Sequence, residues 1–284
     1  MNIKDALEEA TQLLQHTSST TPDGTWLMAE TLQKTTAELM LLAKHELSPS
    51  QIESFFTNIQ RLAAGEPLAY IIGRQPFHEI TLKVNANVLI PRSETELLVE
   101  FVLANLSNHT IQTIADLGTG SGAIALALAC ARPNWQIVAT DISTEALSVA
   151  RENADHLQIS NVYFYQGDWC AALPTQTYNA IISNPPYIAR DDTALAEDVI
   201  RYEPLSAVFA DDNGLADINK IIIQANPLLA ANGLLMIEHG YRQANAVQAL
   251  FKQNHYANIQ TYPDLAGHPR FTVGEKQSSG CRSA

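Results

Sequence analysis

The spacing of hydrophobic residues separates the chain into two regions of different character. Over residues 1–75, apolar side chains recur every third and fourth position, which is the spacing of one face of an amphipathic helix. We expect one helix to begin at Ile3 and a second helical run to cover Trp26–His45. A third helix is expected to begin at Ser48–Gln51, which has the residues of a capping box with a proline at the first helical position. We expect this helix to run through Ala64. The pattern therefore predicts a small all-α domain over residues 1–75.

Residues 76–92 show the alternation of a strand instead of the period of a helix. Ile80, Leu82 and Val84 alternate with polar residues, and the apolar run Val88–Ile90 follows a short polar turn. Two such runs around a turn are typical of a β-hairpin. We therefore expect a β-hairpin linker over residues 76–92.

Strand and helix patterns alternate over residues 93–277. The strand candidates are five short apolar runs: Thr113–Leu117, Gln136–Thr140, Val162–Tyr165, Tyr178–Ile182 and Leu234–Glu238. Helical runs begin between or after them, at Ala123, Thr144, Leu215 and Tyr241. This alternation predicts an α/β domain with a mostly parallel sheet and helices on both faces. The polar residues 278–284 are expected to form a disordered tail.

Charge and composition restrict the class of protein. The formal net charge of −13 argues against a large surface that binds DNA or RNA through phosphates. Three cysteines far apart suit neither a disulfide framework nor a zinc cluster, which favours a reducing compartment. The chain shows neither an apolar signal-peptide core nor a run of about 18 apolar residues. We therefore expect a cytoplasmic protein that is not bound to a membrane.

The first motif with clear chemistry is DLGTGSG at Asp116–Gly122, between a predicted strand and a predicted helix. Glycines there allow a tight turn and close approach of a ligand to the backbone, and the helix N-terminus offers free N–H groups. The spacing is GxGxG, whereas a dinucleotide-binding loop has GxGxxG. We expect Asp116 to lie at the mouth of the site, where it would repel a pyrophosphate and hold a cationic amino-acid group. These features favour S-adenosylmethionine over NAD as the cofactor.

Two further positions follow the next two strands. Asp141 lies about 20 residues beyond the glycine loop, where an acid can accept hydrogen bonds from ribose hydroxyls. It could instead cap the following helix, although Ser143 is available for that task. Trp169 in Gln166–Trp169 follows the third strand and could face an adenine ring, or it could only cover the sheet edge. Both residues indicate that the ligand contains a nucleoside, but they do not distinguish NAD from S-adenosylmethionine.

The stretch IISNPPYI at Ile181–Ile188 ends the fourth strand abruptly, since neither proline can donate a backbone hydrogen bond. Strands one and four are typically neighbours in a doubly wound sheet, so this segment and the glycine loop should share one crevice. An NH₂ group is a poor nucleophile while its lone pair is delocalised. The Asn184 side-chain oxygen and the Pro185 carbonyl could accept both of its hydrogens, and Tyr187 could lie flat against the planar group. On these residues alone the substrate could be adenine or an amide.

With these residues in view, the chain resembles the HemK/PrmC family of release-factor glutamine methyltransferases over nearly its whole length. The resemblance rests on GEPLAYIIG at Gly65–Gly73, VLIPRSETE at Val88–Glu96, DLGTGSGAIALALA at Asp116–Ala129, SNPPYI at Ser183–Ile188, YEP at Tyr202–Pro204 and EHG at Glu238–Gly240. Two departures are mild: Ser93 stands where the family has proline, and Tyr202 where it has phenylalanine.

The resemblance implies a Rossmann-like class I S-adenosylmethionine-dependent methyltransferase that modifies the glutamine of the GGQ motif in peptide-chain release factors. It also implies that the helical N-terminal domain helps to dock the release factor. By motif, the implied cofactor contacts are Gly118, Thr119, Gly120, Ser121, Gly122, Asp141, Trp169 and Asn184. The implied catalytic residues are Asn184, Pro185 and Tyr187, and the implied substrate contacts are Asn184, Pro185, Pro186 and Tyr187.

Two other classes of protein compete with this interpretation. A DNA adenine methyltransferase shares the NPPY segment, but residues 1–90 hold six Lys or Arg against ten Asp or Glu, which disfavours a DNA-reading module. A non-catalytic binding protein for translation factors would have no need of an intact Asn184. No second histidine or cysteine lies at ligand spacing from His239, so no metal is expected. We expect a monomer that does not bind nucleic acid directly.

Overall fold

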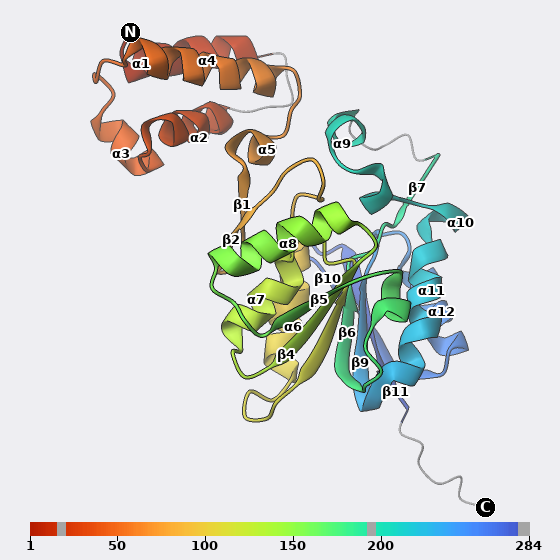
Figure 1. Ribbon diagram of the computed structural model, residues 1–284. Helices are drawn as coiled ribbons and strands as arrows, with labels where there is room; N and C mark the ends of the chain where they lie inside the picture. The colour runs from red at the N-terminus through yellow and green to blue at the C-terminus, as the bar shows by residue number, and fades with distance from the viewer. Residues whose placement is uncertain (16–20, 192–196, 278–284) are drawn as a thin grey trace, which may run out of the picture. The chain divides into compact units, whose positions relative to one another are not determined.

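Figure 1 shows the computed structural model of the protein, which describes residues 1–15, 21–191 and 197–277. The tail that the sequence predicts to be disordered, residues 278–284, lies outside the described residues. No helix within the described ranges combines the length and the apolar composition that crossing a bilayer requires. The described residues group into two compact units, one helical and one built around a sheet.

The helical unit contains the N-terminal helices and also α9 (Glu197–Tyr202), which returns to it from far along the chain. The N-terminal helices are α1 (Ile3–Leu14), α2 (Thr21–Leu32), α3 (Thr36–Leu41), α4 (Pro49–Ala63) and α5 (Leu68–Ile72). Their apolar faces form one core, in which Ile3, Leu27 and Phe55 are completely buried. The Tyr202 hydroxyl of α9 donates a hydrogen bond to the Ala64 carbonyl at 3.0 Å, which ties α9 to the end of α4.

The predicted helices are confirmed in part. Ser48 and Gln51 exchange hydrogen bonds in the predicted capping box at the start of α4. The run Trp26–His45 is wrong as a single helix, because Gln33 adopts a φ of 52° and Thr35 opens a second capping box that starts α3. The short α5 is also missing from the sequence prediction.

The β-hairpin is confirmed, but the sequence prediction placed it too late in the chain. Its strands are β1 (Arg74–Phe77) and β2 (Ile80–Lys83), which pair in a two-stranded sheet. The reversal uses a positive φ of 51° at His78, a conformation that is uncommon for any residue other than glycine. The run Val88–Ile90 belongs to no strand, and the Ile90 N–H donates to the Glu203 carboxylate at 3.2 Å instead.

The second unit is built around a seven-stranded sheet in the order β10-β11-β9-β6-β3-β4-β5. Its five parallel strands correspond to the five predicted ones: β3 (Thr113–Leu117), β4 (Gln136–Asp141), β5 (Val162–Gln166), β6 (Tyr178–Ser183) and β9 (Leu229–Glu238). Two antiparallel strands that the sequence analysis did not predict, β10 (Tyr256–Pro263) and β11 (Pro269–Lys276), extend the sheet beyond β9.

Helices cover both faces of this sheet (Figure 1). On one face lie α6 (Glu96–Asn105), α7 (Ala123–Ala131) and α8 (Thr144–His156), and on the other lie α11 (Ala216–Ala225) and α12 (Ala244–Gln253). Residues 123–129 of α7 are all buried, which explains why that helix is apolar all round. The prediction of helices on both faces is confirmed, although α6 was not among the predicted helices.

Short elements complete the loops of this unit. They are η1 (Ser93–Thr95), η2 (Trp169–Ala172), η3 (Leu205–Ala207), η4 (Asn226–Leu228), α10 (Asp211–Gly214) and the paired strands β7 (Ile188–Ala189) and β8 (Phe209–Ala210). The important pairing for function is that of β3 with β6, in which Leu117 lies opposite Ser183. The glycine loop and the NPPY segment therefore begin side by side, as the sequence predicts.

Candidate active site

The glycine loop leaves the carboxyl end of β3 and is tied to the neighbouring strand by its backbone. The N–H groups of Gly118 and Thr119 donate to the Thr140 carbonyl of β4 at 2.8 and 2.9 Å. Gly118 has a φ of +70°, and a Cβ there would lie 2.8 Å from the Trp169 ring. Gly120 has a φ of +56°, but an added Cβ would meet no atom within 4 Å. Gly118 is therefore required by packing, whereas Gly120 borders open space.

Asp116 corrects one expectation from the sequence. Its side chain is buried below the loop, where Oδ2 accepts from the Thr119 hydroxyl at 2.6 Å and from the Ala125 N–H at 3.2 Å. Its Oδ1 has no hydrogen-bond partner among the described residues. Burial raises the pKa of this carboxyl to about 7. The prediction that Asp116 lies at the mouth of the site is wrong, because it supports the loop from behind.

Asp141 ends β4 and faces the glycine loop. Its Oδ2 accepts from the Gly120 N–H and its Oδ1 from the Ser143 N–H, both at 2.9 Å. The alternative that Asp141 caps the next helix is excluded, because the Ser143 hydroxyl accepts from the Ala146 N–H and is the N-cap of α8. Burial raises the pKa of Asp141. Each of its oxygens still has a lone pair that a ribose hydroxyl could use.

Trp169 is held in an uncommon conformation, with a φ of +46°. Its indole N–H donates to Asp217 at 3.2 Å, and its ring occupies the space that a side chain at Gly118 would need. Beside it, Lys220 pairs with Asp168. Strained backbone is frequent at ligand sites, so the geometry favours a binding role over mere coverage of the sheet edge.

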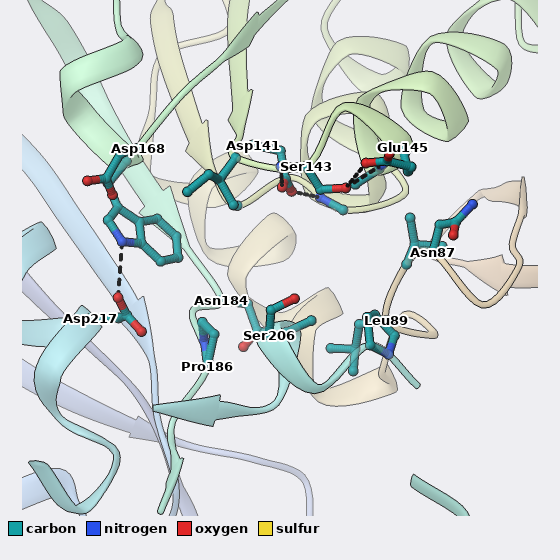
Figure 2. A pocket seen from close by; sticks show the side chains of 18 of the residues that line it. Asn87, Leu89, Asp141, Ser143, Glu145, Asp168, Asn184, Pro186, Ser206 and Asp217 are labelled. Atoms are coloured by element: carbon teal, nitrogen blue, oxygen red, sulfur yellow. Dashed lines mark hydrogen bonds between the residues drawn. The ribbon is translucent and has the colours of Figure 1, made fainter. Parts of the chain in front are cut away.

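These elements surround a crevice of about 530 Å³ (Figure 2). Of the residues singled out from the sequence, those that line it are Gly118, Gly120, Asp141, Trp169, Asn184 and Pro186. Those that do not line it are Thr119, Ser121, Gly122, Pro185 and Tyr187. The sequence analysis missed a second wall, which consists of Ala86, Asn87, Val88, Leu89, Pro204, Ser206 and Ala207. It also missed Asp217 and Lys220 near Trp169.

The two segments of the second wall are joined by a partly buried ion pair. The Arg92 guanidinium donates to the Glu203 carboxylate at 2.6 Å, and the Glu203 side chain is only 2% exposed. The same carboxylate also accepts from the Ile90 N–H. The motifs IPRSETE and YEP carry these residues, but the contact itself spans 111 positions and had no signal in the sequence.

The NPPY segment continues β6 directly into the crevice. The Ser183 hydroxyl donates to the Leu117 carbonyl at 2.8 Å, which fixes the end of β6 against β3. The Asn184 side-chain NH₂ donates to the Thr95 hydroxyl oxygen at 3.0 Å. Pro185 and Pro186 are both buried. The segment therefore presents Asn184 from a rigid base.

Tyr187 is held from two sides. Its hydroxyl donates to Glu238 at 3.4 Å, and its carbonyl accepts from the Gln243 side chain at 2.9 Å. Burial is the main reason that the pKa of the phenol is raised, so the hydroxyl keeps its proton. Its ring does not line the crevice, and the expectation that it stacks on a planar substrate stays a prediction.

His239 has a structural environment. It is buried, with Nε2 at 2.8 Å from the Thr272 hydroxyl and Nδ1 at 3.0 Å from the Gly240 carbonyl. Burial lowers the pKa of this imidazole, which favours its neutral form. Over the described ranges, no group of three His, Cys, Asp or Glu side chains is placed to hold a metal ion.

The sequence matches two protein-family profiles. The profile of the PrmC N-terminal domain matches residues 5–73, and that of the Methyltransferase small domain matches residues 92–203. A release factor glutamine methyltransferase from Coxiella burnetii is 43% identical over 278 residues, which is 97% of this chain and 99% of that protein. Proteins of the same name from Salmonella typhimurium and Escherichia coli are 40% and 38% identical, each over 96% of this chain and 99% of theirs.

Solved structures share the fold at lower identity. A methyltransferase from Pyrococcus furiosus superposes with a TM-score of 0.53 at 17% identity, covering 69% of this chain and 89% of that one. A ribosomal protein L11 methylase from Lactobacillus delbrueckii gives a TM-score of 0.50 at 19% identity, covering 66% and 81%. The Rossmann-like methyltransferase fold expected from the sequence is therefore confirmed.

Proposed function

Since this chain belongs to the release factor glutamine methyltransferase family, we propose that it methylates the side-chain amide of the GGQ glutamine in peptide-chain release factors. The methyl donor is S-adenosylmethionine, the cofactor that the methyltransferase family implies. We also propose that it acts as a monomer, as expected from the sequence. We further propose that this reaction takes place in the cytoplasm, the compartment expected from the sequence.

The observation that carries this proposal is the position of Asn184. It lines the same crevice as Gly118, Gly120, Asp141 and Trp169, and it directly follows β6, the strand that pairs with β3 ahead of the glycine loop. A cofactor on the glycine loop and a planar group on the NPPY segment would thus meet across two neighbouring strand ends. Ligands in open α/β sheets bind at such a point.

The cofactor side of the crevice fits a nucleoside with an amino-acid tail. Asp141 offers carboxylate lone pairs for ribose hydroxyls, and the Trp169 ring offers an apolar surface for a base. The positive φ at Gly118 and Gly120 lets the backbone border the cavity without a side chain in the way. We assign Thr119, Ser121 and Gly122 to shaping this loop, since they do not line the crevice. When bound, the cofactor supplies an activated methyl group on a sulfonium sulfur.

The substrate side of the crevice must expose the nitrogen lone pair of a planar amide. We propose that the Asn184 side-chain oxygen and the Pro185 carbonyl accept the two N–H hydrogens of the glutamine. Acceptance of both hydrogens favours the geometry in which positive charge develops on nitrogen, and the buried prolines limit reorganisation during the reaction. Pro186 lines the crevice beside Asn184, where we propose that it contacts the amide.

The decisive experiment is mass spectrometry of a purified release factor after incubation with this protein and S-adenosylmethionine. We expect one added methyl group on the GGQ peptide. A release factor whose GGQ glutamine is changed to glutamate is the matched control and should gain none. Methylation of duplex DNA with no change in the release factor would overturn the proposal, because it would assign the NPPY segment to adenine.

A further inference from the structure

A chain of buried polar side chains lies behind Asn184, outside the crevice. The Asn184 NH₂ donates to the Thr95 hydroxyl oxygen at 3.0 Å, and the Thr95 hydroxyl donates to Glu238 Oε2 at 2.7 Å. Thr95 and Glu238 are 4% and 1% exposed. The proposed chemistry uses neither of them, yet a buried carboxylate is costly unless it is paired and hydrogen-bonded.

The order of donors and acceptors in this chain fixes the orientation of the Asn184 amide. An ionised carboxylate only accepts hydrogen bonds, so the single hydroxyl proton of Thr95 must point to Glu238. The Thr95 oxygen can then only accept toward Asn184. Its partner must therefore be the amide NH₂ and not the amide oxygen. The Asn184 oxygen is left to face another group, as acceptance of a substrate N–H requires.

We propose that Thr95 and Glu238 are positioning residues, which hold the Asn184 amide with its oxygen directed at the substrate amide. The inference rests on the proposed function, because it assumes that the group in the crevice donates N–H bonds. It adds two residues with a defined task to the reaction. Neither of them lines the crevice, so each acts through Asn184.

The surroundings of Glu238 decide when this orientation holds. Burial raises the pKa of its carboxyl to about 7, although hydrogen bonds from Thr95 and Tyr187 and the charge of Arg270 act in the opposite direction. Glu94 raises the pKa further. The neutral His239 follows on the same strand, and Arg270 is itself paired with Asp264 at 2.9 Å.

Protonation of Glu238 would remove the directional constraint. A protonated carboxyl can donate to the Thr95 oxygen, and the Thr95 hydroxyl proton is then free to point toward Asn184. The amide could rotate by half a turn and present its NH₂ group to the substrate. Two N–H donors would then face each other, so turnover should fall as pH drops through about 7.

The test compares Thr95→Val, which removes the hydroxyl at nearly constant volume, with Thr95→Ser, which keeps it. We expect Thr95→Val to lower kcat on a release factor by roughly tenfold to a hundredfold with unchanged cofactor affinity. Thr95→Ser should retain most of the kcat. Asn184→Ala sets the value for complete loss of the acceptor. Equal losses in Thr95→Val and Thr95→Ser, or no loss in either, would overturn the positioning role.

The Glu238→Gln variant tests the second residue through the pH profile. The wild type should lose kcat below about pH 7, and Glu238→Gln should have a lower kcat without this acidic limb. The same acidic limb in Glu238→Gln would overturn the role of Glu238. Measurement of cofactor affinity for each variant confirms that the fold and the cofactor side remain intact.

A second measurement does not depend on the substrate. The side-chain NH₂ signals of Asn184, identified by their loss in Asn184→Asp, should titrate near pH 7 in NMR spectra of the wild type but not of Glu238→Gln. Signals that do not titrate would overturn the inference even if catalysis were normal. An inactive wild type whose signals titrate as expected would instead count against the proposed function alone.

Discussion

Two buried carboxylates at the ends of strands, Asp116 and Glu238, look alike at first. Each is about 1% exposed, each accepts a short hydrogen bond from a threonine hydroxyl, and burial raises the pKa of each to about 7. They differ in where their partners come from. Thr119 lies three positions from Asp116, whereas Thr95 lies 143 positions from Glu238.

The candidate active site is therefore stabilised in two ways, by a contact between residues close in the sequence and by a contact between residues far apart in it. Asp116 stabilises the glycine loop from within its own motif, because both of its hydrogen-bond donors, Thr119 and Ala125, follow it within nine positions in the sequence. Glu238 joins three elements that meet only in the folded sheet, namely η1, the end of β9 and the loop after β6. We therefore expect changes at Asp116 to alter cofactor binding and stability, and changes at Glu238 to alter turnover.

The largest expected effect on stability comes from Asp116→Ala. It leaves the Thr119 hydroxyl and the Ala125 N–H without their acceptor, at about 1–3 kcal/mol for each buried group. We expect the free energy of unfolding to fall by about 2–6 kcal/mol and cofactor affinity to fall with it. Denaturant unfolding and titration with S-adenosylmethionine would measure both.

The matched control for this change is Asp116→Asn, which keeps an acceptor oxygen in place. It should retain more stability than the alanine variant. Burial raises the pKa of the native carboxyl to about 7, so a neutral amide resembles its protonated form. Wild-type cofactor affinity in Asp116→Ala would contradict the view that Asp116 supports the loop.

The next effect in size concerns the pH dependence of stability. Both carboxyls hold their protons to higher pH in the folded chain than their ordinary pKa values of 3.8 and 4.5 allow. Their protonated forms therefore stabilise the folded chain at low pH, and this contribution disappears as pH rises toward about 7. Each group should change the unfolding free energy by up to about 1.4 kcal/mol per pH unit in that window.

Unfolding curves of wild type, Asp116→Asn and Glu238→Gln between pH 5 and 7 would test this. Each variant should lose one contribution and show a shallower fall in stability than the wild type. Parallel curves for all three proteins would exclude raised pKa values at these positions. For Glu238 the sign is instructive, because the ionised form that we propose for catalysis is the less stable one.

A further expected effect, similar in size, is that of Gly118→Ala. The new Cβ would lie 2.8 Å from Cζ3 of Trp169, in a backbone conformation that disfavours a side chain. We expect a loss of about 1–3 kcal/mol in stability and a change in tryptophan fluorescence as the ring moves. Gly120→Ala is the control, since its Cβ contacts no atom within 4 Å and should leave the fluorescence unchanged. An identical fluorescence change in both variants would contradict the packing of Trp169 on Gly118.

The contrast between contacts that are close in the sequence, as at Asp116, and contacts that are far apart in it, as at Glu238, also explains how much of the structure could be predicted from the sequence. The five parallel strands and the adjacency of the glycine loop and NPPY segment follow from local apolar runs and from the rules of doubly wound sheets. The edge strand β10 and the strand β11 beside it could not be predicted in this way. β10 alternates partly buried and exposed positions, so it is not a local apolar run, and no crossover helix separates the two strands. The turns at Gln33 and His78 could not be predicted either, because a positive φ is uncommon for residues other than glycine.

The candidate site shows the same limit. Asp141, Trp169 and Asn184 could be found because each follows a strand at a fixed edge of the sheet. The direction of the Asp116 side chain and the partners of Glu238 could not, because they depend on side-chain packing across the assembled fold. Glu238 itself had two signals in the sequence, because it is a charged residue directly after the apolar run Leu234–Ile237 and it begins the motif EHG.

The long separation in sequence between Thr95 and Glu238 has a consequence for folding during synthesis. A chain that emerges from the ribosome in order can complete the hydrogen bonds of Asp116 soon after residue 125 and those from the glycine loop to β4 soon after residue 141. It cannot fix Asn184 until β9 has been made and inserted beside β6. Nascent chains should therefore acquire a shaped cofactor loop well before they can orient a substrate. An enzyme that acts on the termination machinery would thus become active only when its own synthesis is nearly finished.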